Sequence, residues 1–340
     1  MLTVMPSFYD DFHCKAGACT DSCCIGWEID IDDETAGRYR QVTGKFGEVL
    51  RENITVSEEG VPCFRLTADE RCPFLQRDGL CRIYRELGKD SLCEICREHP
   101  RFYSFLADRT ECGLGLCCEE ACALLLNKEP MALVTEDDGV PCDTDDDEQF
   151  LLSVREMLFG ILADRNTPLR QRIRQLLQTA ECAQKQHFPD LQTEAFPFDG
   201  QTLFDFTVRT FRETEPLDGA WTDYINRLAE EKDKILQDGV FPDDETVYEK
   251  LLGYLLYRYF VEHSLEIPMT RVLHFCLVNL AFLLLCDGKT IREKNGISLS
   301  DRIDNIKRWS KQTEYSEENI EFLYRAIADK KNQNDIKKHD

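Results

Sequence analysis

Apolar residues in the second half of the chain recur at intervals of three and four, which places them on one face of a helix. The clearest run consists of Leu169, Ile173, Leu176, Leu177 and Ala180. We expect Thr167 to cap this helix and Pro168 to occupy its first position. Comparable patterns predict helices at about 150–163, 203–213, 221–236, 244–262, 269–286 and 317–329. This part of the chain is therefore predicted to be all-helical.

The first part of the chain has a different, shorter pattern. Residues 61–67 and 71–75 are short strand-like runs, and Asp78-Gly79 is a turn signal that returns the chain through 80–83. Short helices are expected to follow, one ending near Gly88, one around 91–98 and one at roughly 117–127. We predict a mainly α protein in which an irregular, cysteine-rich N-terminal metal-binding domain with a short β-hairpin precedes an all-helical domain.

An acidic segment separates these two parts. Residues 136–148, EDDGVPCDTDDDE, contain eight acidic residues and no basic one. A stretch of this kind repels itself and buries little surface, so we expect an exposed connection. The predicted organisation is a cysteine-rich domain at 1–135, an acidic linker at 136–148, a helical domain at 149–330 and a frayed tail at 331–340.

Composition and charge exclude several classes of protein. The chain has 41 Lys and Arg residues against 64 Asp and Glu residues, a net charge of −23, which repels nucleic-acid phosphates and favours a basic partner. The longest apolar run, 272–286, is short for a membrane span and is interrupted by His274 and Asn279. The N-terminal sequence MLTVMPSFYDDFHCK lacks the pattern of a signal peptide. We therefore expect a cytoplasmic protein that binds neither nucleic acid nor membrane.

Cysteine provides the strongest chemical signal. Thirteen of the 17 cysteines lie in the first 122 residues, and a chain of this length does not need disulfides to compensate for a small core. In a reducing compartment, dense cysteines indicate metal binding or thiol chemistry. The segment FHCKAGACTDSCCIGW places Cys14, Cys19, Cys23 and Cys24 within eleven residues. Adjacent Cys23 and Cys24 cannot easily bind the same metal, so they serve different centres or lie in an irregular loop.

Further candidate ligands are Cys72 and Cys81 at the two ends of the expected turn, the pair Cys93 and Cys96, and Cys118. Zinc and iron–sulfur clusters both accept four thiolates, so spacing alone does not separate them. The spacing of three cysteines found in radical S-adenosylmethionine enzymes is absent. For Cys182, Cys276 and Cys286 we expect a buried, inert role.

Four segments together resemble the ordered landmarks of the flagellin lysine-N-methylase (FliB-type) family: FHCKAGACTDSCCIGWEIDID, CPFLQRDGLCRIYRELG, LCEICREHPR and LCCEEACALLL. That family is in turn similar to cysteine-rich zinc- or iron-chelating domains. The resemblance covers about residues 8–127. Cys93, Cys117 and Cys122 depart from the family pattern, because they add thiols beside its landmarks.

The resemblance implies transfer of a methyl group from S-adenosylmethionine to lysine ε-amines of flagellin or of another lysine-bearing protein, with an iron–sulfur cluster, 4Fe–4S in type, and zinc as the alternative. The metal ligands carried over are Cys14, Cys19, Cys23, Cys24, Cys72, Cys81, Cys96 and Cys118. Eight thiolates fill two four-ligand sites, or one site with four left over. The sequence identifies no catalytic base and no S-adenosylmethionine site. A non-catalytic zinc-binding interaction protein and an iron–sulfur redox protein using Cys93 and Cys96 are the competing readings.

Overall fold

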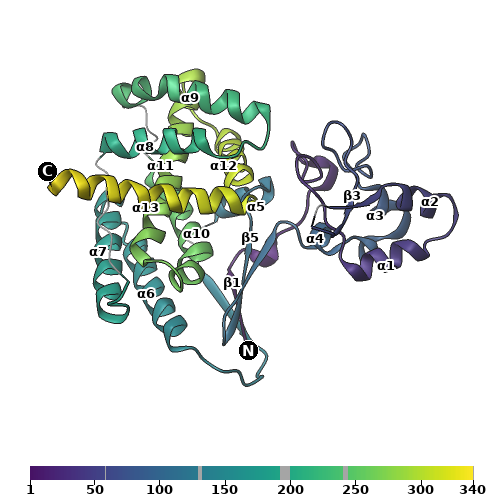
Figure 1. Cartoon of the computed structure of the whole chain (residues 1–340), viewed down its shortest axis with the longest axis horizontal. Coiled ribbons are helices and arrows are strands. Elements are labelled where there is room, and N and C mark those ends of the chain that lie inside the picture. Colours follow the sequence, from purple (N-terminus) through teal and green to yellow (C-terminus); the bar gives the residue numbers. More distant parts are fainter. Residues whose placement is uncertain (58, 129–131, 192–199, 240–243, 340) are drawn as a thin grey trace.

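The computed structural model describes residues 1–57, 59–128, 132–191, 200–239 and 244–339, and it divides into two parts with separate hydrophobic cores. We call residues 13–99 the lobe and residues 1–12 and 100–339 the body. Figure 1 shows the lobe beside the body, joined to it through a small sheet. The predicted fold class is confirmed: the body is mainly helical and the irregular lobe contains a short hairpin.

The body is a helical assembly around two central helices. Its helices are α6 Asp146–Ala163, α7 Leu169–His187, α8 Gly200–Glu213, α9 Gly219–Asp238, α10 Glu245–Ser264, α11 Met269–Lys294, α12 Leu299–Thr313 and α13 Glu317–His339. α10 and α11 are buried on nearly every side and pack against each other, because both are apolar around most of their circumference. α11 is long and apolar enough to cross a membrane, but 89% of its most apolar window is buried inside the protein, as in the core helix of a soluble protein.

A four-stranded sheet lies between the lobe and the helices. Its strands are β1 Leu2–Pro6, β4 Arg101–Phe105, β5 Arg109–Leu114 and β6 Leu133–Asp137, in the order β4-β5-β1-β6. β1 is parallel to β5, and the other two pairs are antiparallel. The buried Arg155 of α6 binds Glu111 of β5 with an N–O distance of 2.6 Å, and the Tyr257 hydroxyl of α10 donates to the backbone of Val4 or Cys112. These contacts attach the sheet to the helical body.

The lobe has a small core of its own around Tyr39, Phe64 and Phe74. Its elements are α1 Asp33–Gln41, α2 Gly44–Glu52, β2 Ile54–Val56, β3 Pro62–Phe64, α3 Arg82–Leu87 and α4 Glu94–Glu98, with 3₁₀ turns at Ala16–Ala18 and Lys89–Ser91. A further 3₁₀ turn at Tyr9–Asp11 belongs to the body. α5, Glu119–Asn127, follows β5 and belongs to the core of the body. Short elements dominate the lobe because its sequence offers no long apolar period.

The hairpin differs in position from the sequence expectation. The expected strand at 61–67 forms β3, but its partner is β2, which precedes it. Residues 71–75 form no regular strand and make only single bridges, between Ile25 and Arg71 and between Leu75 and Cys81. The turn at Asp78-Gly79 is confirmed, since Gly79 has a φ of +76° and its N–H donates to the Gln76 carbonyl.

The predicted helices are confirmed within a few residues at their ends, except that α11 continues to Lys294 instead of ending at 286 and α13 continues to His339 instead of ending at 329. The sequence did not predict α1, α2, α12 or the four-stranded sheet. Thr167 does not cap α7: Pro168 takes the cap position, and the Thr167 hydroxyl instead donates to Asp164. The boundaries between the parts of the described chain also differ from the predicted domain boundaries. Within 136–148, β6 extends to Asp137 and α6 begins at Asp146, and α13 continues through 331–339. The body core takes residues from both sides of position 135.

Candidate functional site

The loop that carries the first four cysteines is held against the Asp78-Gly79 turn. Ala16 adopts a left-handed φ of 49° within a 3₁₀ turn, and Gly17 lies so close to the Asp78 carbonyl that an added Cβ would stand 2.5 Å from that oxygen. The approach requires glycine at position 17. It brings the loop beside the turn between Cys72 and Cys81, so that cysteines far apart in the sequence become neighbours.

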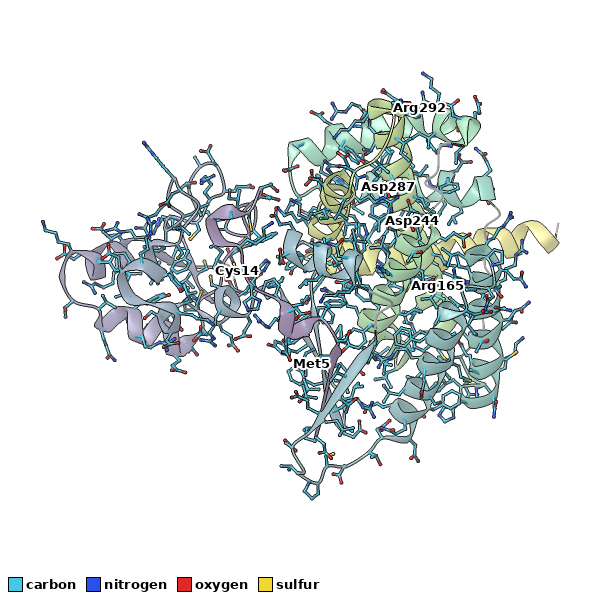
Figure 2. All side chains as sticks on the ribbon, turned by 180° about the vertical axis from the view of Figure 1, so that it is seen from behind. Met5, Cys14, Arg165, Asp244, Asp287 and Arg292 are labelled. Carbon is cyan, nitrogen blue, oxygen red and sulfur yellow. The ribbon has the colours of Figure 1, made fainter. Side chains whose placement is uncertain are left out.

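Four sulfurs lie close enough for their charges to influence each other. We call Cys14, Cys19, Cys23 and Cys118 the first sulfur group. Burial raises the pKa of Cys19 to about 11, and the negative charges of Glu119, Cys118 and the other loop cysteines raise it further in the same direction. The pKa of Cys118, at the N-cap of α5, is raised by burial and then by Cys23 and Cys14. Figure 2 shows Cys14 on the side of the lobe that faces the body.

A second set of sulfurs lies deeper in the lobe, and we call Cys24, Cys72, Cys81, Cys93 and Cys96 the second sulfur group. The Sγ atoms of Cys93 and Cys96 are 3.2 Å apart, and the Cys72 N–H donates to the Cys24 carbonyl. The pKa of Cys72 is raised to about 12, chiefly by burial and then by Cys81 and Cys93. The hydrogen bond from Cys96 lowers the pKa of Cys93. Cys93, which departs from the family pattern, therefore lies with the predicted ligands.

Cys23 and Cys24 stand at the boundary of the two groups. The pKa of Cys23 is raised by a hydrogen bond with Cys24, by burial and by the charge of Cys24. Cys23 acts on the pKa of Cys118 in the first group and on that of Cys81 in the second. Whether these two adjacent cysteines serve different centres or share an irregular loop stays a prediction.

Among the described residues, no three cysteine, histidine or carboxylate side chains converge tightly enough to hold a metal ion as they stand. The donor chemistry nevertheless fits a thiophilic metal. Several thiols have raised pKa values because they are buried near one another, and a cation between them would favour the thiolate form that metals bind. Rotation of the side chains around such a cation is required before they could ligate it.

The remaining cysteines belong to neither group, although Cys117 and Cys122 lie close enough to Cys118 for its charge, after burial, to raise the pKa of both. Cys63 is buried in β3, Cys112 is in β5, and Cys122 is buried in α5 with its thiol donating to the Leu116 carbonyl at 3.0 Å. Cys276 and Cys286 are buried in α11, as expected, whereas Cys182 is exposed on α7 and that expectation was wrong. The expectation rested on the tendency of free cysteine to be buried, and the side chain of Cys182 instead lies on the exposed face of α7.

An aromatic cluster covers the junction between lobe and body. Trp27 of the lobe stacks on Tyr315 of the body with ring centroids 5.3 Å apart, and the Lys311 ammonium lies 5.6 Å from the Trp27 ring. His99 is next to both rings, and its Nε2 is 3.7 Å from the Cys117 Sγ. Burial lowers the pKa of His99 to about 4, and Lys311 lowers it further. A neutral imidazole therefore fills this junction.

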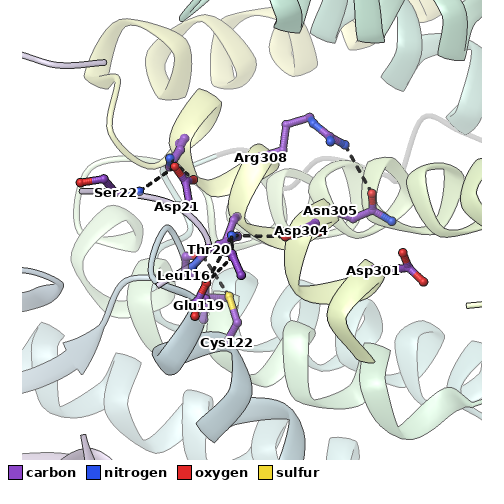
Figure 3. Close-up of polar contacts among 12 residues, drawn as sticks. Thr20, Asp21, Ser22, Leu116, Glu119, Cys122, Asp301, Asp304, Asn305 and Arg308 are labelled. Atoms are coloured by element: carbon purple, nitrogen blue, oxygen red, sulfur yellow. Dashed lines mark hydrogen bonds and ion pairs between the residues drawn. The ribbon is translucent and has the colours of Figure 1, made fainter. Parts of the chain in front are cut away.

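A polar joint, formed by Lys15, Thr20, Asp21, Glu119, Lys307 and Lys311, fixes the cysteine loop to the body. Figure 3 shows Thr20, Asp21 and Glu119 of this joint beside α12. The Glu119 carboxylate accepts from Lys15 Nζ at 2.7 Å and from the Thr20 N–H at 3.0 Å. Burial alone would raise the pKa of Glu119, but these hydrogen bonds lower it to about 2. Lys307 of α12 lies 3.8 Å from the same carboxylate, and Lys311 forms an ion pair with Asp21.

Sequence reasoning missed this polar joint. Lys307 and Lys311 belong to α12, a helix that the apolar pattern did not predict, and Tyr315 follows it. Glu119 was noted only as the neighbour of Cys118. Repeated placement of Lys at 307 and 311, one helical turn apart, is the one signal that could have indicated a basic face on this segment.

Comparison with known proteins adds a decisive observation about the body. The C-terminal domain of FliB lysine N-methylases matches residues 201–338, from α8 to α13. A flagellar biosynthetic protein FliU from Salmonella muenchen is 30% identical over 138 residues, which cover 38% of this chain and 79% of that relative. The chain belongs to the FliB lysine N-methylase family. The FliB-type landmarks at 8–127 and the FliB C-terminal domain are thus found in one chain.

Two longer members of the FliB family match over the same length. The lysine-N-methylases of Salmonella choleraesuis (strain SC-B67) and of Salmonella typhimurium (strain LT2) are each 31% identical over 138 residues. The match covers 38% of this chain but only 33% of each of those relatives. No solved structure matches the chain. In this FliB-family chain, the family-matched segment provides Lys307 and Lys311 of α12 and Tyr315 just after it, the residues that contact the cysteine loop.

Proposed function

We propose that this protein is a lysine N-methyltransferase that transfers a methyl group from S-adenosylmethionine to lysine ε-amines of flagellin in the cytoplasm. The observation that carries the proposal is the joining of two family features in space: α12, inside the segment that matches FliB, holds the cysteine loop through Lys307 and Lys311. A relative covered over most of its length is named a flagellar protein, and two others are named lysine-N-methylases.

The proposed reaction forms one bond and breaks one. The lone pair of a neutral lysine nitrogen attacks the sulfonium methyl, a C–N bond forms, the S–CH₃ bond breaks and its electrons stay on sulfur, giving S-adenosylhomocysteine. The nitrogen then loses a proton to solvent or to a carboxylate of the site. Lysine reacts only after deprotonation, so a site for this reaction must lower the lysine pKa or accept its proton.

We further propose that the two sulfur groups hold iron–sulfur clusters, 4Fe–4S in type, with zinc as the alternative. The first group offers Cys14, Cys19, Cys23 and Cys118, and the second offers Cys24, Cys72, Cys81, Cys93 and Cys96. A cluster iron with an open coordination position would supply a binding point for the amino and carboxylate groups of S-adenosylmethionine. The chain's own contribution is to supply thiolates and, through Lys15, Lys307 and Lys311, positive charge beside them.

The proposal is tested with protein purified without oxygen. Metal and sulfide analysis and visible absorption distinguish iron–sulfur from zinc. Incubation with isotopically labelled S-adenosylmethionine and flagellin should then increase the mass of modified lysine peptides by one methyl group each. Protein with an intact cluster that transfers no label would contradict the methyltransferase proposal, and colourless protein containing zinc would favour a non-catalytic metal-binding platform.

A further inference from the structure

The buried Glu119 carboxylate contacts residues that are next to cysteines of the first sulfur group. It accepts a hydrogen bond from Lys15 Nζ at 2.7 Å and another from the Thr20 N–H at 3.0 Å. Figure 3 shows Thr20 and Glu119 pointing toward each other from separate segments of the chain. Each of these three residues directly follows a cysteine of the group: Cys14, Cys19 and Cys118. One carboxylate therefore connects three of the four cysteine positions.

The cysteine loop is folded so that both of its ends reach this carboxylate. The Ala18 N–H donates to the Lys15 carbonyl at 3.0 Å. The Cys19 N–H donates to the Ala16 carbonyl at 3.2 Å. These bonds close a 3₁₀ turn between the first two cysteines of the loop. The turn brings together the residues that follow these two cysteines, so that both bind Glu119 at once.

Glu119 belongs to the body, whereas the loop belongs to the lobe. Glu119 is the first residue of α5, and Cys118 is the N-cap of that helix. Ala121 of α5 is buried in the core of the body, and Lys250 of α10 donates to the Leu126 carbonyl at 2.7 Å. α5 is thus anchored in the helical body. The first sulfur group therefore takes its sulfurs from both sides of the junction between lobe and body.

The charge of Glu119 does not by itself favour a metal site at this position. Four thiolates around one divalent cation carry a net negative charge, which a nearby carboxylate repels and nearby ammonium groups attract. Burial, and then the negative charge of Glu119, raise the pKa of Cys19 to about 11. Any gain in metal affinity from Glu119 must therefore come from the position in which it holds the loop. Charge and position predict opposite effects when the carboxylate is removed.

We infer that Glu119 is the positioning residue of a metal site built across the junction between lobe and body, where it holds the cysteine loop toward Cys118. This inference rests on the proposed metal binding by the first sulfur group. A contact that holds ligand segments together offsets part of the entropy lost when they gather around a metal. The carboxylate is already engaged by the loop, so Glu119 acts through the ligands and is not one of them.

Titration of the reduced, metal-free full chain with Co²⁺ tests the inference, because thiolate–cobalt absorption reports binding without a native cluster and without methyl transfer. Each sulfur group is measured alone after two cysteines of the other are replaced. Cys72→Ser with Cys96→Ser leaves the first group, and Cys14→Ser with Cys19→Ser leaves the second.

Glu119→Ala should weaken Co²⁺ binding by the first group about 10–100-fold, the usual effect of losing a residue that orients metal ligands. Glu119→Gln keeps one acceptor oxygen and should have an intermediate affinity. Neither substitution should change Co²⁺ binding by the second group. Glu120→Ala is the matched control, because it removes the same charge from the next residue of α5, 4.0 Å from Lys15 Nζ. It should bind Co²⁺ as the wild type does or slightly more tightly.

Equal or tighter Co²⁺ binding by the first group of Glu119→Ala protein would overturn the inference, because charge would then outweigh position. Equal weakening of both groups would also overturn it, since that is the result of a general loss of stability. A first group that binds no Co²⁺ with Glu119 intact would contradict the proposed metal site and this inference together. Failure of the proposed methyl transfer is seen separately, as wild-type protein that leaves flagellin unlabelled, and does not alter the Co²⁺ result.

Discussion

The chemical role of a cysteine in this protein depends more on the groups around its side chain than on its spacing in the sequence. Cys19 and Cys63 are both cysteines of the N-terminal region, but the pKa of Cys19 is raised by burial, Glu119 and other cysteines, whereas that of Cys63 is raised by burial and the nearby carboxylates Glu28 and Asp30. A cluster of thiols can share a cation, and an isolated thiol among carboxylates has no thiol partner with which to do so. Composition alone could not separate these two roles.

Cys19→Ser should therefore remove the centre of the first sulfur group and leave that of the second. We expect the iron and sulfide content of anaerobically prepared protein to fall to about half, because one of the two proposed cluster sites is lost. Cys63→Ser is the control and should retain the wild-type content. Equal metal content in Cys19→Ser and wild-type protein would contradict the assignment of Cys19.

Individual helices show where sequence patterns succeed and fail. α7 and α9 were predicted because their apolar residues repeat on one face. α12 was missed because several of its buried residues are polar: Asn305 donates to Asp287, and Gln312 donates to Thr214 and to the Glu215 carbonyl. These polar groups are satisfied only by distant residues, so nothing local marks them as internal.

The sequence also did not predict the four-stranded sheet or the division of the cysteines into two groups, and the reason is related. β5 contains the buried Glu111, which a periodicity argument treats as a surface residue until its partner Arg155 is known. The sequence could single out candidate ligands, because cysteine is chemically distinctive wherever it occurs, and their role as ligands stays a prediction. The division into two groups was not predictable, because it depends on the contact of the loop at Gly17 with the turn at Gly79.

At the level of one element, the capping box of α12 gives a pH prediction. Ser298 and Asp301 bond reciprocally, and hydrogen bonds from Lys294 and Ser298 lower the pKa of Asp301 to about 2 from an ordinary value of 3.8. A lowered folded-state pKa stabilises the protein above the ordinary pKa, and this stabilisation is lost as pH falls toward 2. Asp301→Asn should lower the free energy of unfolding by about 1 kcal/mol at pH 7.

Urea unfolding at a series of pH values checks this expectation. The difference between wild type and Asp301→Asn should shrink between about pH 4 and pH 2. Asp223→Asn, an exposed carboxylate on α9, should show no such difference at any pH. A stability gap for Asp301→Asn that persists unchanged at pH 2 would show that the carboxylate charge is not the cause.

The ion pair between Glu111 of β5 and Arg155 of α6 gives a second prediction at the level of single elements. Glu111→Gln leaves the buried Arg155 without a carboxylate partner, and an unpaired buried charge typically costs about 3–5 kcal/mol. Chemical denaturation should show a loss of that order. Glu136→Gln, on the exposed edge strand β6, should be within about 0.5 kcal/mol of the wild type. Similar unfolding midpoints for the two variants would refute this role of the ion pair.

At the scale of the whole molecule, the lobe and the body are two cores that meet at a small junction. The polar joint and the Trp27–Tyr315 stack provide the described side-chain contacts between the cysteine loop and α12 and its end. A polar joint is held by a few hydrogen bonds and ion pairs, so a single substitution is expected to weaken it strongly. The position of the first sulfur group relative to the family-matched helices depends on this junction.

Replacing both Lys307 and Lys311 with Met should loosen the lobe without unfolding the body. We expect faster proteolysis within residues 13–24 and greater amide exchange there, while the exchange of α10 and α11 stays as in the wild type. Lys185→Met, which removes an exposed ion pair with Glu181, is the control. Uniform acceleration of exchange across the body would mean that the lysines stabilise the entire fold rather than the junction.

The chain enters and leaves the lobe from nearby strands of the same sheet. The chain enters the lobe after β1 and returns at β4, two positions away in the same sheet, a separation of about 10 Å. Entry and exit points this close are those of an inserted domain, whose removal leaves ends that a short loop can bridge. The body has a hydrophobic core of its own, and removal of the metal proposed for the lobe is expected to disorder the lobe while the body stays folded.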